Sequence, residues 1–226
     1  IMSDAFNLAM KPRRGPVCIN LPRNILADSN SYNINTKKPS FTNEIKQKGS
    51  KDNIKKAAKL IEASNCSVII VGAGIKYNSK YKEVIKLAEL CNIPIVTAAG
   101  HGDAIPFGHK LNAGQMGPRG NPVASRLVKN ANVILAIGTR LGFNSTFYSY
   151  ENINKKANII QIELEKKMLG KYFPATVKIH ADAATATKQL YDQIKKDKIK
   201  FNLKNWTNLY LKERNEYLQK RDKENL

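Results

Sequence analysis

Four unbroken apolar runs constrain the fold of this chain more than any other feature of its sequence. They read CSVIIVGAG at 66–74, IPIVTAA at 93–99, NVILAIGT at 132–139 and NIIQIELE at 158–165. A shorter run, TVKIH, ends at His180. Runs rich in Val and Ile, without alternating polar residues, are typical of strands that are buried on both faces of a parallel sheet.

Helical patterns separate these runs. Apolar residues at helical spacing precede the first run: Ile54, Ala57, Ala58 and Ile61. Three further helices are predicted: 79–91, 121–131 and 183–196. Asn121 is the expected N-cap of the second, with Pro122 at its first helical position. This alternation predicts an α/β fold over residues 51–198, a three-layer, doubly wound parallel sheet of the Rossmann-like type.

The flanking segments have other patterns. Residues 1–26 suggest a short helix, SDAFNLAM, and a strand, VCINL, which together cannot close a core, so we expect the end of another α/β domain. The chain lacks a starting methionine, which fits a piece of a longer protein. Residues 27–50 are polar and aperiodic, as in a linker. Residues 199–226 predict a helical linker toward a further domain, with an apolar stripe that packs on a neighbour: Trp206, Leu209, Tyr210, Tyr217 and Leu218.

Charge and cysteine content narrow the class of protein. The chain has 38 Lys and Arg against 18 Asp and Glu, a net charge of +20. The excess is spread along the chain and consists mainly of lysine, whereas nucleic-acid binders concentrate arginine and aromatic residues, so we expect no nucleic-acid partner. Cys18, Cys66 and Cys91 lie one per apolar stretch without CxxC spacing, which favours buried, reduced thiols. Without a leader or a long apolar run, a cytoplasmic protein with no membrane contact is expected.

Glycines mark the ends of three predicted strands, where parallel sheets bind ligands. Gly72 and Gly74 follow the first strand, Gly100 the second and Gly138 the third. Glycine lets the backbone approach a phosphate, and a helix N-terminus supplies donors. Tyr77 stands where a dinucleotide motif would have a third glycine, so tight-turn packing and nucleotide binding both remain open.

No complete catalytic or metal-binding pattern appears. The spacing of His101, Asp103, His109 and His180 matches no metal-ligand motif, so no metal site is expected. GxSxG and reactive-cysteine patterns are also missing, and we assign no catalytic residue to this chain. We expect His101 and His109 to cap turns or to pack at an interface, and the alternative is that they face a substrate or nucleotide.

Several segments in order along residues 1–190 resemble thiamine-diphosphate enzymes of the acetolactate synthase and pyruvate oxidase type. RRGPVCINLPRNIL is similar to the end of their pyrimidine-binding domain. Their central domain is resembled by AAKLIEASNCSVIIVGAGI, AELCNIPIVTAAGHGDAIPFGHKLNAGQMG, ANVILAIGTRL and NIIQIELE, while HADA stands where the family usually has Gly-Asp-Ala. The resemblance assigns 1–26 to the first domain and 51–198 to the central one. The pyrophosphate-binding domain would follow residue 226.

Within the family, two segments depart from acetolactate synthases. GQMGPRGNP and TRLGFNST stand where a Gly-Met-His-Gly-like and an Arg-Phe-Asp-Asp-Arg-like element are expected. HGDAIPFGHKL and GTRLGFNSTFY are instead similar to the sulfoacetaldehyde acetyltransferase subfamily, which converts sulfoacetaldehyde and phosphate to acetyl phosphate and sulfite in taurine degradation. The alternatives are an acetolactate synthase, an oxalyl-CoA decarboxylase-like enzyme, or, in another class, a non-catalytic nucleotide-binding structural module.

The resemblance also implies cofactors and partners. Thiamine diphosphate and Mg²⁺ would be held by the other two domains, so this piece would be inactive alone, and the enzyme would be a homodimer or homotetramer. FAD or an ADP-like group could occupy the central domain, held by matched positions at four strand ends: Gly72, Ala73, Gly74, Thr97, Gly100, Gly138, Thr139, Arg140 and Glu163. Glu163 would accept a ribose hydroxyl. Arg140 would pair with a phosphate, or else form a surface ion pair.

Overall fold

The computed structural model describes residues 1–11, 14–29, 46–76 and 80–224, and divides the chain into two compact units, Ile1–Ile45 and Lys46–Leu226. The second unit contains a six-stranded sheet in the order β3-β2-β1-β4-β5-β6, with every neighbouring pair parallel. The predicted doubly wound α/β fold is therefore confirmed. The strands are β1 (Ser67–Val71), β2 (Ile95–Thr97), β3 (Asn112–Gln115), β4 (Val133–Ile137), β5 (Asn158–Glu163) and β6 (Val177–His180).

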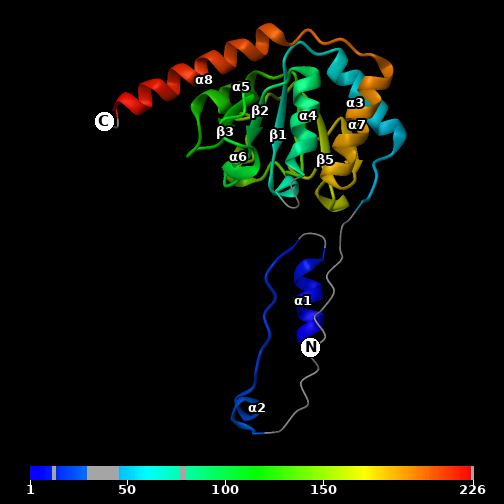
Figure 1. Ribbon diagram of the computed structural model, residues 1–226, viewed down its shortest axis with the longest axis vertical. Coiled ribbons are helices and arrows are strands. Elements are labelled where there is room, and N and C mark those ends of the chain that lie inside the picture. The colour runs from blue at the N-terminus through cyan, green and yellow to red at the C-terminus, as the bar shows by residue number, and fades with distance from the viewer. Residues whose placement is uncertain (12–13, 30–45, 77–79, 225–226) are drawn as a thin grey trace. The chain divides into compact units, whose positions relative to one another are not determined.

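Helices cover both faces of the sheet, which gives the three layers (Figure 1). One face carries α3 (Lys51–Glu62), α4 (Tyr81–Cys91) and α7 (Ala183–Asp197). The other carries α5 (Pro122–Asn130) and α8 (Lys204–Glu224). Shorter helical turns follow the strands: η1 (Ala73–Ile75), η3 (Gly102–Ala104), α6 (Phe143–Thr146) and η4 (Lys166–Met168).

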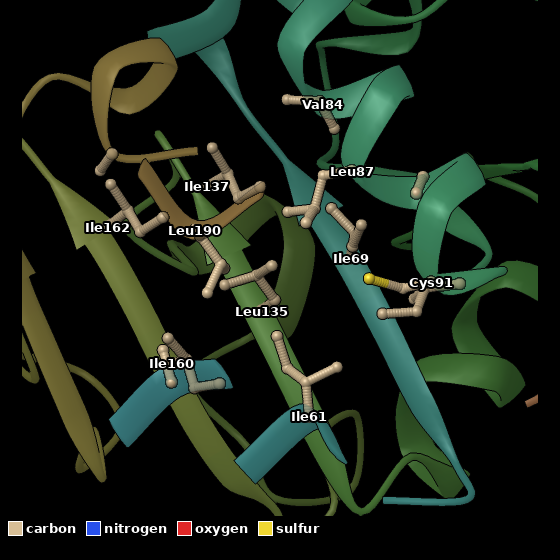
Figure 2. Packing of buried hydrophobic residues seen from close by; sticks show 14 of the residues in the cluster. Ile61, Ile69, Val84, Leu87, Cys91, Leu135, Ile137, Ile160, Ile162 and Leu190 are labelled. Carbon is tan, nitrogen blue, oxygen red and sulfur yellow. The ribbon is translucent and has the colours of Figure 1, made fainter. Parts of the chain in front are cut away.

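The apolar runs form the core because the two central strands are buried on both faces. Every residue of β1 and β4 is buried. Figure 2 shows one of the two interfaces, where side chains of the sheet meet side chains of the helices: Ile69, Leu135, Ile137, Ile160 and Ile162 face Ile61, Val84, Leu87, Cys91 and Leu190. Burying such side chains contributes about 1.5–3 kcal/mol each, so these runs determine the fold.

Helix boundaries follow the predicted signals. The Asn121 side chain caps α5 by accepting a hydrogen bond from Val123 N at 2.8 Å, and Pro122 opens the helix. Asp182 caps α7 in the same way, accepting from Thr185 N at 3.0 Å. The four apolar residues predicted to share one face of α3 are all buried.

The structure corrects two expectations about local structure. Strand β3 was not predicted, because its sequence NAGQ is short and polar and forms an edge of the sheet. The predicted strand at 17–21 is not regular structure, since no strand pairs with it in the described part of the chain. The first unit has the predicted helix, α1 (Met2–Met10), and a second helix that was not predicted, α2 (Arg23–Ala27).

Part of the predicted linker belongs to the second unit. Residues 30–45 lie outside the described residues, but 46–50 are bonded to the sheet edge and to α7. Asp182 N donates to Gln47 O at 2.9 Å, and Gly49 N donates to the Gln189 side chain at 2.8 Å. The assignment of residues 1–26 to the end of a preceding domain, and of 199–226 to a helical linker toward a further domain, stays a prediction.

Helix α8 packs with a face that differs partly from the predicted stripe. Trp206 donates its indole N–H to Ser67 O at 2.8 Å, and Tyr210 is buried. Leu209 was expected to pack but is 52% exposed, because Thr207 takes the inward position and donates to Asn92 O at 2.6 Å.

The cysteines differ in their surroundings. Cys91 is buried, as expected, whereas Cys66 is only half-buried and Cys18 is exposed in the first unit, so the prediction of a buried thiol is wrong for Cys18. Burial raises the pKa of Cys91 to about 12 and also raises the pKa of Cys66. In the described part of the chain, no helix is both long and apolar enough to cross a membrane.

Candidate functional site

The carboxyl ends of four adjacent strands lie side by side at one end of the sheet, and we call this end the rim. In the sheet these strands stand in the order β2-β1-β4-β5. All nine residues predicted to hold a nucleotide lie at the rim: Gly72, Ala73, Gly74, Thr97, Gly100, Gly138, Thr139, Arg140 and Glu163. Strand order reverses between β1 and β4, the place where open α/β sheets bind ligands. The structure therefore brings the predicted residues together at one end of the sheet, and their role in nucleotide binding stays a prediction.

At this reversal point the glycine turns contact each other. Gly72 N donates to Ile137 O at 3.1 Å, and Gly74 N donates to Gly138 O at 3.0 Å. A Cβ on Gly74 would lie 2.6 Å from Gly138 Cα, and Gly138 has a φ of +58°. Glycine is needed at these positions for close packing, one of the two roles that the sequence left open. The backbone N–H groups of Gly72 and Gly74 are already used, so they do not offer a cradle for a phosphate between β1 and β4.

The polar side chains of Thr139 and Glu163, at the ends of β4 and β5, already accept hydrogen bonds from the backbone. Thr139 is buried, and its hydroxyl oxygen accepts from Leu141 N at 3.3 Å. One carboxylate oxygen of Glu163 accepts from Leu164 N at 2.9 Å and from Glu165 N at 3.2 Å. These bonds stabilise the turn after β5, and the predicted contact of Glu163 with a ribose would have to be made beside them.

Arg140 is exposed at the rim, close to a stacked pair of tyrosines. The rings of Tyr148 and Tyr172 lie 4.4 Å apart between centroids. A hydrogen bond to Tyr148 lowers the pKa of Tyr172, and the positive charges of Lys171 and Arg140 act in the same direction. The described residues give Arg140 aromatic neighbours, and the predicted pairing with a phosphate stays a prediction.

A polar cluster after β1 and β2 was only partly anticipated. Lys76 Nζ lies 2.8 Å from Asp103 Oδ2. His101 lies close enough to both that their charges affect its pKa. Burial lowers this pKa most, the charge of Lys76 lowers it further, and the charge of Asp103 raises it. His101 and Asp103 were considered from the sequence as possible metal ligands, but no pattern pointed to Lys76. Lys76 reaches Asp103 only because β1 and β2 are adjacent in the sheet.

Two buried polar atoms at this end of β2 have no hydrogen-bond partner among the described residues: Thr97 Oγ1 and His101 Nδ1. Thr97 is only 1% exposed. Buried polar groups without partners cost free energy unless a ligand or water supplies the bond. Thr97 and the open turn at Gly100 thus fit a bound polar group, whereas the contact between Gly74 and Gly138 does not.

The other two histidines have structural contacts. Nδ1 of His109 accepts from Leu111 N at 3.3 Å, a local turn contact of the expected kind. His180 contacts Gln47 through Nδ1 at 3.0 Å and Leu164 O through Nε2 at 2.9 Å. Within the described ranges, no group of three or more His, Cys, Asp or Glu residues could hold a metal ion.

A shallow depression lies away from the rim, between α3 and α7. It has a volume of about 220 Å³ and is open to solvent. Its lining residues are Lys51, Ile54, Gln189, Asp192, Gln193 and Lys196. None of them belongs to the predicted site, so the rim remains the candidate functional site.

The strand order and the helix-covered parallel sheet place the chain in the class of Rossmann-like α/β domains. Residues 54–190 match the family model for the central domain of thiamine pyrophosphate enzymes. Thiamine pyrophosphate is another name for thiamine diphosphate. The match covers more than half of the 226 residues. The chain therefore belongs to the thiamine pyrophosphate enzyme family and contains its central domain.

Relatives within the family have two different activities in their names. The acetolactate synthase large subunit of Buchnera aphidicola (Schizaphis graminum) is 30% identical over 211 residues, 91% of this chain and 36% of that protein. A probable sulfoacetaldehyde acetyltransferase of Rhizobium meliloti is 32% identical over 181 residues, 79% of this chain and 30% of that protein. The sulfoacetaldehyde acetyltransferase of Roseovarius nubinhibens is 31% identical over 84% of this chain and 32% of that protein. The chain spans about a third of the length of these relatives.

Proposed function

We propose that this chain is the central part of a thiamine-diphosphate-dependent sulfoacetaldehyde acetyltransferase, which forms acetyl phosphate and sulfite from sulfoacetaldehyde and phosphate. The proposal is supported by the resemblance of 101–111 and 138–148 to that subfamily and by relatives of that name at 31–32% identity. Both segments lie in the second unit and follow rim strands, β2 and β4 respectively.

One structural observation carries this choice within the family. The two segments in which the chain departs from the acetolactate synthase pattern, 114–122 and 139–146, contact each other. A Cβ on Gly117 would lie 2.7 Å from the carbonyl oxygen of Asn144. Gly117 N donates a hydrogen bond to Ser125 Oγ at 3.2 Å, which fixes the first segment to α5. Residues that depart together in the sequence also contact each other in space, as expected if both belong to one altered surface near the rim.

Acetolactate synthase is the second candidate function. It is favoured by the long alignment with the Buchnera protein, which covers 91% of this chain. It is the second candidate because residues 114–122 and 139–146 lack the Gly-Met-His-Gly-like and Arg-Phe-Asp-Asp-Arg-like elements expected of acetolactate synthases.

In either enzyme the central domain would position the reacting parts. Thiamine diphosphate, when bound with Mg²⁺, supplies the nucleophilic carbanion chemistry. We assign no reacting group to this chain. Its own contribution would be a rigid sheet, whose rim segments are held by bonds such as Ala99 N to Ser145 Oγ at 2.9 Å. FAD or ADP at the rim and a homodimeric or homotetrameric assembly remain part of the proposal.

The test uses the complete protein encoded by the gene, purified with thiamine diphosphate and Mg²⁺. Sulfite release from sulfoacetaldehyde should require phosphate and should equal the acetyl phosphate formed. Omitting phosphate or thiamine diphosphate provides the control. Formation of acetolactate from pyruvate, without sulfite release from sulfoacetaldehyde, would overturn the proposal in favour of the second candidate.

A further inference from the structure

Four polar residues come together after β1 and β2, and we call them the Lys76 cluster: Lys76, Thr97, His101 and Asp103. Lys76 Nζ and Asp103 Oδ2 lie 2.8 Å apart, and the exposed fractions of their side chains are 31% and 68%. The cation is thus partly shielded, while its carboxylate partner is largely in solvent. Such a pair exchanges readily, since exposed ion pairs contribute little free energy.

The Thr97 side chain lies on the same sheet face as the residues next to Lys76 and Asp103 in the sequence. Side chains alternate along a strand, so Thr97 shares a sheet face with Ile95. Ile95, Ile75 and Ala104 belong to one buried cluster on that face. Ile75 directly precedes Lys76, and Ala104 directly follows Asp103. Thr97 is 1% exposed, and among the described residues its hydroxyl oxygen has no hydrogen-bond partner, so the hydroxyl can form a further bond on this face.

His101 adds a second unsatisfied atom, its Nδ1. Burial lowers the pKa of this imidazole and the charge of Lys76 adds to that effect, so the fold favours the neutral ring. A neutral imidazole and a hydroxyl can each donate one hydrogen bond, and the ammonium of Lys76 can donate several. The turn beside them has room, because a Cβ on Gly100 would meet no atom within 4 Å. Gly100 has a φ of +80°, which favours glycine.

We propose that the Lys76 cluster binds a small oxyanion, such as phosphate or sulfite, and that Asp103 is an internal competitor which leaves Lys76 when the anion binds. Lys76 supplies the charge, while Thr97 and His101 use the bonds that they now lack. Binding requires the loop at 100–103 to open, because both unsatisfied atoms are buried. The proposal concerns binding by this chain and holds whether or not the reaction proposed above is correct.

The experiment measures phosphate binding to the 226-residue chain by calorimetry at pH 7.5, with chloride at equal ionic strength as the reference. Lys76→Met should raise the Kd about tenfold, the value of one charge-assisted hydrogen bond. Asp103→Asn should lower the Kd, by about threefold or more, because the competitor loses its charge. The matched control is Lys167→Met, which removes another ion-paired lysine, 2.8 Å from Glu165, and should leave the Kd unchanged.

Opposite effects of the two substitutions separate a binding site from a structural ion pair, because breaking a structural pair from either side has the same sign. Thr97→Val should weaken binding and Thr97→Ser should retain it. Sulfite and ADP are tested as competitors, and ADP competition would identify the oxyanion as a nucleotide phosphate rather than a free anion. Equal phosphate binding by the wild type, Lys76→Met and Lys167→Met, or an Asp103→Asn variant that binds no more tightly, would overturn the proposal.

Discussion

Asp182 is the residue whose replacement tests the packing of this domain most directly. Its carboxylate is 6% exposed and makes three contacts: with Thr185 N at 3.0 Å, with Thr185 Oγ1 at 2.8 Å and with Lys80 Nζ at 2.5 Å. It thus caps α7 and ties the residue before α4 to it. An N-cap contributes about 1 kcal/mol and a charge-assisted hydrogen bond about 1.5–3 kcal/mol. Asp182→Ala should therefore lower the free energy of unfolding by about 3 kcal/mol.

Two further variants separate these contributions. Asp182→Asn keeps a good N-cap but loses the charge, so it should cost about 1–2 kcal/mol. Asp192→Asn, an exposed acid on the same helix, is the control and should have an effect within about 0.5 kcal/mol. Urea unfolding followed by circular dichroism measures all three. The reasoning is refuted if Asp182→Ala costs less than about 1 kcal/mol, or if Asp182→Asn is as damaging as Asp182→Ala.

Three other predictions concern the glycines, the histidine of the rim and the thiols. Gly74→Ala should lower stability by about 2–3 kcal/mol, because its Cβ would lie 2.6 Å from Gly138 Cα, while Gly142→Ala, which meets no atom within 4 Å, should be neutral in thermal unfolding. The pKa of His101 is lowered in the fold, chiefly by burial, so the unfolded chain binds more protons and stability should fall as the pH drops below 6.5. His101→Asn should flatten that decline in denaturation curves recorded between pH 5 and 8. Cys18 should react first with Ellman's reagent, and Cys91, whose pKa is about 12, only after unfolding; simultaneous labelling would contradict this order.

The glycines show how far a sequence pattern can define a site. Their positions after apolar runs predicted correctly that they lie on one rim. Whether they approach a ligand or each other could not be predicted, because this depends on the distance between two turns that are over 60 residues apart. The structure shows Gly74 against Gly138, so packing explains both residues.

The Lys76 cluster shows a second limit. His101 and Asp103 attracted notice as polar residues in an unusual segment, but no local pattern marked Lys76 or the buried Thr97 hydroxyl as their neighbours. Their proximity depends on β1 and β2 lying side by side, with Val71 in register with Thr97. Burial and missing hydrogen-bond partners are also properties of the folded chain alone.

The sequence by itself determined the class of fold, since continuous apolar runs separated by amphipathic helices bury their surface only as a parallel sheet covered on both faces. It also determined the helix start at Asn121, because capping depends on neighbours in the chain. Tertiary structure alone decided that the polar segment NAGQ is an edge strand, that residues 46–50 attach to β6 and α7, and which rim atoms are left without partners. The physical reason is that these features come from hydrogen bonds and contacts between distant segments, which leave no periodic trace along the chain.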